Sequence, residues 1–326
     1  MADKQLFNNR VYGVQIIKSK NSNYNADFTG SPRTLPDGTV YSTDKVAKFN
    51  IRKYMGRKDE KAIFTKTTYT KDLKPMTLKD VYEYHFGTIK RGKGETDKTK
   101  SEVLKDLLSK IDVRLFGATF APKGADNMNI SIHGPVQISY GLNRFKELPD
   151  SGMYTDQIGS PYASKEGADQ TTLGSQIRSK EAHYVHHFSI NPQNLLNYIN
   201  QFQDNANDFC LLYDDDIQLL KEAMAVATTY YDSTSKKDSE NEFLLWIELK
   251  ENSEKILRNF TDLIDIASGE NGKTLINFEH ITSYLDNFSE DIDRMEVYYD
   301  KEFTEVKGLP KNCGEAKSLN SIFQSK

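Results

Sequence analysis

A basic helix is the clearest local signal in the sequence, and it lies between residues 42 and 56. Ser42, Thr43 and Asp44 are favourable N-cap residues, and Gly56 is a typical residue at a helix end. At 100° per residue, the cationic and apolar side chains separate onto opposite faces. The cationic face carries Lys45, Lys48 and Arg52, and the apolar face carries Ala47, Ile51 and Tyr54. The pattern predicts a helix that packs on a sheet and exposes a row of positive charge.

A strand and a long polar loop come before this helix. Residues 9–18 alternate in side-chain character up to Ile16, which predicts a strand. Residues 19–38 are dense in Asn, Gly, Pro and Asp, which favour turns and loops. We expect strand, loop and helix to form one unit whose positive face can hold a polyanion. A solvated surface of Lys and Arg gives the same pattern, so the helix alone does not decide between the two.

Charge is distributed unevenly along the chain, although the formal net charge is only −4. Residues 1–110 hold 23 basic and 13 acidic residues, a net charge of +10. Residues 204–305 hold 9 basic and 25 acidic residues, a net charge of −16. Because salt screens charge beyond about 8 Å, each part of the surface acts locally. One face can therefore meet phosphates while another faces basic partners or solvent.

Bulk composition limits the class of protein. A length of 326 residues allows one large domain or two modest ones, and 37% hydrophobic residues predict a core surrounded by polar loops. No apolar run approaches a membrane span, and the first residues lack an apolar signal core, so we expect a cytoplasmic protein without a membrane partner. Cys210 and Cys313 form no CxxC pair, which argues against a disulfide framework or a structural zinc site.

Further elements are predicted from periodicity and from cap residues. Residues 87–100 are cationic and glycine-spaced, which fits an ordinary solvated linker as well as a loop that contacts nucleic acid. Predicted helices cover residues 77–86, 101–110, 214–227 and 253–267. Predicted strands cover residues 62–69, 182–192, 242–249 and 294–299, with alternating apolar residues also on both sides of a Gly-Pro break within residues 129–141.

Histidines and acidic residues do not form a recognisable metal motif. His183, His186 and His187 lie on a predicted strand, which divides them between its two faces, and neither an HExxH motif nor a Cys cluster accompanies them. The acidic run at residues 214–216 suits the positive end of a helix. We therefore expect neither a metal site nor a cofactor.

Two further motifs follow the basic helix. Residues 112–117 read Asp-Val-Arg-Leu-Phe-Gly, and residues 134–138 read Gly-Pro-Val-Gln-Ile. By itself the first motif is also compatible with core residues beside a local ion pair of Asp112 and Arg114. The strand, loop and basic helix of residues 9–56 come first, and these two motifs follow them in the same order as in a known family. The chain thereby resembles the guide-RNA-binding backbone subunit of CRISPR Cascade complexes of the type I-B kind. That family is part of the repeat-associated mysterious protein superfamily.

The resemblance in the opening unit rests on particular residues. Relatives often carry Asn-Gly-Asp-Pro in the loop, where this chain has Asn-Ala-Asp-Phe at residues 25–28. The matching residues are Asn23, Asn25, Asp27, Arg33, Thr43, Asp44, Lys45, Lys48, Arg52, Lys53 and Tyr54.

The resemblance implies a mixed α/β (α+β) fold, in which residues 1–326 form a single modified RNA-recognition-like domain. Its palm is an RNA-recognition-motif or ferredoxin-like sheet with large insertions, namely a finger-like insertion at residues 57–110 and a thumb-like excursion at residues 142–181. The excursion has little periodicity, which is unusual inside a compact domain. The usual aromatic motif of RNA-recognition sheets is absent, so we expect phosphate contacts from the helix and loops.

The implied function is that of a non-catalytic subunit in antiviral defence. It oligomerises with neighbouring copies of itself along guide crRNA, contacts other Cascade subunits and supports recognition of target DNA by base pairing. The excursion adds Phe145, Met153 and Tyr154 as side chains suited to nucleotides. The expected RNA-binding residues are Asn23, Asn25, Arg33, Thr43, Lys45, Lys48, Arg52, Lys53, Arg144 and Arg178.

The alternative is a metal-dependent endoribonuclease of the same superfamily. Related backbone subunits of type III complexes cut RNA from an Asp in a comparable loop, and Asp27 is the matching residue. Two-metal chemistry needs further carboxylates beside the first, and the sequence places none there.

Overall fold

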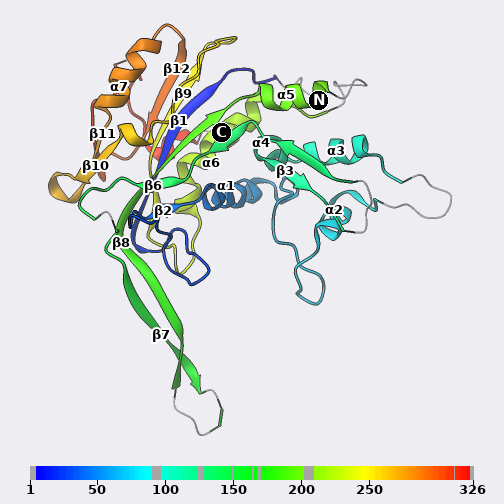
Figure 1. The fold of residues 1–326 in the computed structure, drawn as a ribbon, viewed down its shortest axis with the longest axis horizontal. Coiled ribbons are helices and arrows are strands. Elements are labelled where there is room, and N and C mark those ends of the chain that lie inside the picture. The colour runs from blue at the N-terminus through cyan, green and yellow to red at the C-terminus, as the bar shows by residue number, and fades with distance from the viewer. Residues whose placement is uncertain are drawn as a thin grey trace.

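One antiparallel sheet organises the chain in the computed structural model (Figure 1). The structure describes residues 5–89, 97–123, 128–148, 150–163, 165–166, 170–201, 209–311 and 313–323. The main sheet has the strand order β12-β9-β1-β8-β6-β2, and β5 and β7 also pair with β8. A second sheet has the order β10-β11-β13, and β3 pairs with β4. The mixed α/β fold class is confirmed.

The elements have the following bounds. The strands are β1 Val11–Ser22, β2 Tyr41–Ser42, β3 Gly117–Phe120, β4 Ile130–His133, β5 Val136–Ile138, β6 Gly141–Asn143, β7 Tyr154–Ala163, β8 Gln170–Ile190, β9 Ser239–Leu249, β10 Asp265–Ser268, β11 Thr274–Asn277, β12 Ile292–Tyr298 and β13 Thr304–Lys307. The α-helices are α1 Asp44–Lys58, α2 Leu78–Phe86, α3 Lys100–Leu108, α4 Ile111–Phe116, α5 Gln193–Asn200, α6 Asp214–Tyr230 and α7 Glu279–Leu285. None of these helices is long and apolar enough to cross a lipid bilayer.

Strand β1 lies at the centre of the main sheet, between β8 and β9. Gly13 faces Phe188 on one neighbour and Trp246 on the other. A Cβ atom at Gly13 would lie 2.1 Å from the carbonyl oxygen of Leu245 and 2.4 Å from the Phe188 ring, so only glycine allows this close approach. The predicted strands 9–18, 182–192, 242–249 and 294–299 are confirmed as β1, the second half of β8, β9 and β12.

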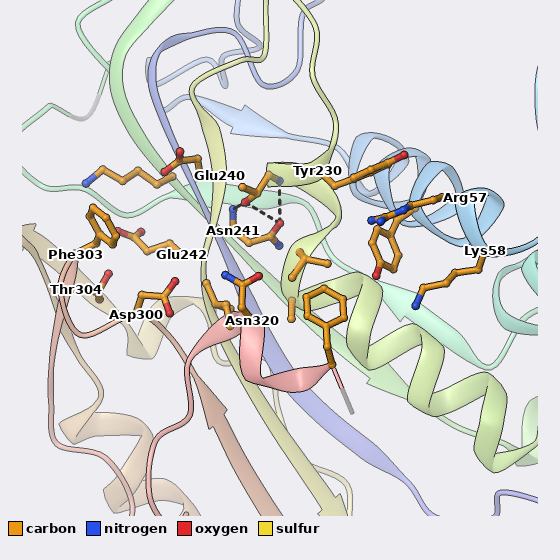
Figure 2. Close-up of a pocket in the computed structure, with 17 residues that line it drawn as sticks. Arg57, Lys58, Tyr230, Glu240, Asn241, Glu242, Asp300, Phe303, Thr304 and Asn320 are labelled. Atoms are coloured by element: carbon orange, nitrogen blue, oxygen red, sulfur yellow. Dashed lines mark hydrogen bonds between the residues drawn. The ribbon is translucent and has the colours of Figure 1, made fainter. Parts of the chain in front are cut away.

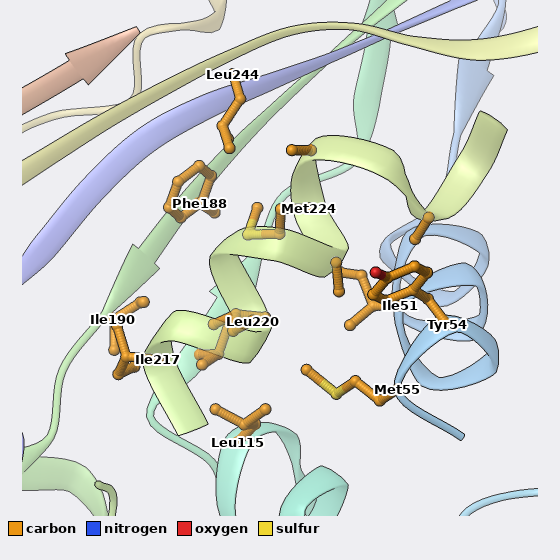
Figure 3. Packing of buried hydrophobic residues seen from close by; sticks show 14 of the residues in the cluster. Ile51, Tyr54, Met55, Leu115, Phe188, Ile190, Ile217, Leu220, Met224 and Leu244 are labelled. Atoms are coloured by element: carbon orange, nitrogen blue, oxygen red, sulfur yellow. The ribbon is translucent and has the colours of Figure 1, made fainter. Parts of the chain in front are cut away.

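Helices α1 and α6 cover one face of the sheet, and Figure 3 shows their contact. Ile51 and Tyr54 of α1 pack in the same buried cluster as Met224 of α6 and Phe188 of β8. The predicted apolar face of α1 is therefore confirmed. The helix does not end at Gly56, however, because that residue stays helical and α1 continues to Lys58.

The other face of the sheet is covered by α7 and the small sheet β10-β11-β13. Phe243 of β9 stacks on Phe278 in a second buried cluster. The predicted helix at residues 253–267 is wrong, because this segment is irregular and leads through a short 3-10 turn into β10. Its apolar residues have helical spacing, but the Asn259 side chain accepts a hydrogen bond from the Thr261 N–H and so favours a turn.

A third buried cluster joins α2, α3, α4 and the β3-β4 pair. The predicted helices 77–86 and 101–110 are confirmed as α2 and α3, each with a capping box at its start. The strands on both sides of the Gly-Pro break are confirmed as β4 and β5. The predicted strand at residues 62–69 is wrong. The Asp112 carboxylate accepts the N–H groups of Phe64 and Thr65, both at 2.8 Å, and so takes the donors that a strand partner would need.

A two-stranded hairpin projects far from the rest of the chain (Figure 1). It consists of β7 and the first part of β8, with Tyr154 opposite Arg178 near its base and Ala163 opposite Gln170 near its end. The predicted excursion at residues 142–181 contains this hairpin, and β6 at its start belongs to the main sheet. The basic stretch 87–100 lies partly outside the described residues, which break off between 89 and 97.

A buried ion pair joins α4 to α6. The Arg114 guanidinium donates to both carboxylate oxygens of Asp216, at 3.0 and 2.7 Å, and to the carbonyl oxygens of Leu108 and Ser109. Both charged side chains are almost fully buried. Arg114 therefore does not form the local pair with Asp112 that the motif allowed. Asp112 instead holds the backbone at residues 64 and 65 and lies 3.4 Å from Arg52.

We predict that Asp216→Ala destabilises the protein by ~3–5 kcal/mol, because it leaves the Arg114 guanidinium buried without its counter-charge. Urea unfolding measures the effect. The control is Asp215→Ala, which removes an exposed acidic residue from the same helix turn and should cost less than ~1 kcal/mol. Equal losses for the two variants would show that the ion pair is not required.

Candidate nucleic-acid interface

Two asparagines hold the loop between β1 and β2 in place. Asn23 is buried, and its side-chain amide donates to the carbonyl oxygens of Gly30 and Ile177, both at 3.0 Å. It thereby ties the loop to the hairpin strand β8. The Asn25 side-chain oxygen accepts from the Thr43 N–H at 2.8 Å and from its hydroxyl at 3.0 Å. Thr43 is the N-cap residue of α1, so this contact joins the loop to the start of the helix.

Asp27 forms the turn at the tip of this loop. One oxygen of its carboxylate accepts the Thr29 N–H and hydroxyl, both at 2.7 Å, and the Ser31 N–H at 3.0 Å. The Thr29 hydroxyl makes the largest contribution to lowering the pKa of Asp27, and the backbone donors lower it further. Phe28, beside it, is fully exposed. The described residues contain no group of three or more potential ligands placed to hold a metal ion.

The predicted row of cations on α1 is divided in the structure. Lys48 pairs with Asp44 at 3.0 Å, and its ammonium lies 5.7 Å from the centre of the Phe116 ring. Arg52 lies 3.4 Å from Asp112 and 5.0 Å from the same ring. Their side chains are only 13% and 17% exposed. The expectation that both face outward is therefore wrong, because Phe116 and Asp112 of α4 hold Arg52, and Phe116 with Asp44 of α1 itself holds Lys48.

Three other cations form no direct ion pair among the described residues, and we call Arg33, Lys45 and Lys53 the cationic surface. Lys45 and Lys53 are exposed on α1, and Lys53 lies over the Phe49 ring at 5.7 Å. Arg33 is half-buried beside β2, where its carbonyl oxygen accepts the Tyr41 N–H at 2.9 Å. Within the described ranges none of the three forms an ion pair, and the buried Nε of Arg33 has no hydrogen-bond partner.

The two arginines of the excursion contact the protein. Arg178 donates to the carbonyl oxygen of Asn21 at 3.0 Å and pairs with Asp156 at 3.4 Å, so it braces the base of the hairpin. Arg144 donates to the carbonyl oxygen of Ile264 at 3.1 Å and lies 3.4 Å from Asp262. Arg178 therefore belongs with the loop after β1, whereas Arg144 joins β6 to the segment before β10.

The three histidines have separate roles in the fold. His183 lies between the carboxylates of Glu242 and Glu181; burial opposes its charge, but the carboxylates prevail and raise its pKa. Burial lowers the pKa of His186 to about 4 and that of His187 to about 4, so both rings are neutral at pH 7. His186 Nδ1 donates to the Ser139 carbonyl oxygen at 2.9 Å, and its Nε2 accepts from the Ser42 hydroxyl at 2.9 Å.

The structure shows an aromatic pair near the cationic surface that the sequence analysis does not predict. The rings of Tyr41 and Tyr140 are stacked with centroids 5.5 Å apart and planes 16° apart. Tyr140 is 53% exposed. No local sequence pattern predicts this pair, because the two residues are 99 positions apart in the sequence. They meet only through the pairing of β2 with β6.

A cavity of about 840 Å³ lies between the ends of α1 and α6 and the C-terminal segment (Figure 2), and neither Tyr41, Tyr140 nor a residue of the cationic surface lines it. Its wall includes Arg57, Tyr230, Glu240 and Asp300. Arg57 packs over the Tyr230 ring at 5.1 Å, and Glu240 and Asp300 supply acidic groups. Because this wall carries both acidic and basic side chains, it lacks the excess of positive charge that a polyanion-binding surface needs.

Comparison with known proteins agrees with this architecture. Two solved structures share the fold, one titled "CRISPR RNA-guided surveillance complex" and one "CRISPR RNA-guided surveillance complex, pre-nicking". The first is 12% identical with a TM-score of 0.50, over 97% of this chain and 95% of the other. The second is 13% identical with a TM-score of 0.51, over 96% and 98%. No match was found among curated proteins.

The family assignment comes from the sequence. The pattern of the family described as "CRISPR-associated protein Cas7" matches residues 9–286, which include β1, the loop, α1, the hairpin and most of the second sheet. The match covers most of the chain, and the chain therefore belongs to the CRISPR-associated Cas7 family.

Proposed function

We propose that this protein is a backbone subunit of a type I Cascade complex, of the I-B kind, that works in the cytoplasm. It binds guide crRNA, neighbouring copies of itself and other Cascade subunits, and it supports pairing of the guide with target DNA. Family membership and the fold shared with surveillance complexes support this proposal. The observation that carries it is that Arg33, Lys45 and Lys53 form no direct ion pair among the described residues and lie on a loop that Asn23 ties to the hairpin strand β8, and on the helix that follows this loop.

Contacts to the RNA backbone are the chemistry that this surface suits. In guide-dependent recognition, base pairing reads the sequence, and the protein needs only to hold phosphates and shape. The cationic surface supplies charge for phosphates, and Lys48 and Arg52 add a weaker field because each lies beside a carboxylate. Asn23, Asn25, Thr43 and Arg178 position the backbone that presents these charges, whereas Arg144 holds the end of β6 against the segment before β10.

The hairpin fits the role of a thumb within a single-domain chain whose finger is residues 57–110. Its described side chains at residues 153–157 are exposed, and Gly174 and Ser175 on the opposite strand are exposed too. A lone two-stranded ribbon is at best marginally stable in water. A surface of this kind gains stability when a neighbouring subunit or an RNA strand covers it.

We infer that the subunit does not catalyse RNA cleavage. The Asp27 oxygen that holds the turn already accepts three hydrogen bonds. A carboxylate engaged in this way serves the loop conformation, and two-metal hydrolysis requires additional ligands close by. The endoribonuclease alternative is therefore not favoured.

The charge of the cationic surface can be tested by salt dependence. We predict that Arg33→Ala with Lys45→Ala weakens binding to unrelated RNAs equally and reduces the magnitude of the log K against log [salt] slope by about 1.4, at ~0.7 per phosphate contact. The RNA should accommodate only one subunit. The control removes Lys250 and Lys255, two exposed lysines of the acidic half that form no ion pair among the described residues, and should leave the slope unchanged. An unaltered slope in the first variant would exclude this surface.

The hairpin can be tested by replacement of residues 157–175 with a short Gly/Ser link. This change retains the contacts of Asn23, Arg178 and Asp156 at the base. We predict cooperative thermal unfolding close to that of the wild type, together with loss of regular assembly on long guide RNA in sedimentation experiments. Binding to a one-subunit RNA should persist. Regular assembly by the shortened protein would contradict the thumb role.

Catalysis can be tested with labelled RNA and Mg²⁺. We predict that the wild type cleaves neither guide RNA nor complementary RNA, and that Asp27→Asn behaves alike. Cleavage by the wild type that disappears in Asp27→Asn would instead establish the nuclease.

A further inference from the structure

We propose that Tyr140, supported by Tyr41, forms a stacking platform for one nucleobase of the bound single-stranded RNA. This inference rests on the proposed function and deepens it, because it adds a base contact to a surface otherwise suited to phosphates. Stacking uses the flat face that every base has, so the platform does not select a sequence.

The geometry of the pair leaves much of the Tyr140 side chain accessible. The two rings are offset and nearly parallel, with planes 16° apart and centroids 5.5 Å apart. Tyr41 is half-buried, whereas Tyr140 is 53% exposed, so the pair ends at a ring open to solvent. Offset stacking is the arrangement that aromatic rings prefer, and a base can continue it on the open side.

The backbone on both sides of Tyr140 is held rigidly. Ser139 donates its N–H to the His187 carbonyl oxygen at 2.8 Å, and its hydroxyl oxygen accepts the His187 N–H at 3.0 Å. A Cβ atom at Gly141 would lie 2.5 Å from His186 Nε2 and 2.6 Å from the Ser42 hydroxyl, so this residue packs directly on the buried Ser42–His186 pair. The backbone at Tyr140 therefore loses little further freedom when a base stacks on its ring.

Tyr41 connects the platform to the cationic surface. Its N–H donates to the Arg33 carbonyl oxygen, and β2 leads directly into α1, where Lys45 follows four residues later. Bases and phosphates of one strand are held together when aromatic rings and cations share one surface. This proximity distinguishes Tyr140 from the exposed ring of Phe303, which lies beside β13 in the C-terminal part of the chain.

The test is a binding cycle between protein and RNA variants. Wild type and Tyr140→Ala are titrated with a one-subunit RNA and with an abasic oligonucleotide of the same length. We expect Tyr140→Ala to bind the normal RNA about tenfold more weakly, in line with ~1–3 kcal/mol per stacked base, and the abasic oligonucleotide as the wild type does. The salt slope should not change, because no phosphate contact is lost.

Two further variants serve as controls. Tyr140→Phe retains the ring and should bind within about twofold of the wild type, and Phe303→Ala should not alter binding. Thermal unfolding of Tyr140→Ala should remain cooperative, with the midpoint lowered by at most a few degrees, since a cross-strand pair contributes little to stability.

The possible failures differ from one another. If Tyr140→Ala binds normal RNA as tightly as the wild type, the tyrosine pair is only a cross-strand contact. This result would overturn the stacking platform but not the proposed function. Equal losses on normal and abasic oligonucleotides would show that Tyr140 acts through loop geometry, which also overturns it. A wild type that binds no RNA would remove the proposed function together with the platform.

Discussion

The antiparallel pairing of β8 with β1 is the interaction on which the rest of the structure depends. Residues Val11 to Ser22 of β1 pair with residues Ile190 to Ser179 of β8. The long strand β8 therefore belongs both to the middle of the main sheet and to the base of the hairpin. The same strand continues outward to pair with β7. Because its backbone hydrogen bonds continue from core to hairpin, the projecting ribbon has a fixed direction relative to the sheet.

Buried and half-buried polar groups then fix the loops around this strand. Asn23 joins the loop after β1 to β8, and Asp112 holds the backbone before α2. His186 joins β8 to Ser42 and Ser139. Each of these side chains satisfies backbone or hydroxyl groups that regular secondary structure leaves unpaired, and so holds an irregular segment in place. Their placement decides which cations and rings reach the surface.

Electrostatics at the surface depends on which charges have partners. Lys48 and Arg52 count toward the net charge of +10 in residues 1–110, yet each lies beside a carboxylate and the Phe116 ring. Arg33, Lys45 and Lys53 form no direct ion pair among the residues that the structure describes. Since salt screens charge over about 8 Å, a ligand senses these local differences and not the average over the chain.

The sequence by itself determined the elements with strong local signals and the family. The caps of α2 and α3, the apolar faces of α1, α2, α3 and α6, and the apolar runs of β1, β8, β9 and β12 depend on neighbours close in sequence, so their patterns were sufficient. Tertiary structure decided what depends on distant residues. Asp112 prevented a strand at residues 62–69, and the turn at Asn259 prevented a helix over residues 253–267. Phe116 determined the direction of Lys48 and Arg52, and the pairing of β2 with β6 joined Tyr41 to Tyr140. A periodic pattern records which face is apolar, whereas the partner of a side chain is set only when the chain closes on itself.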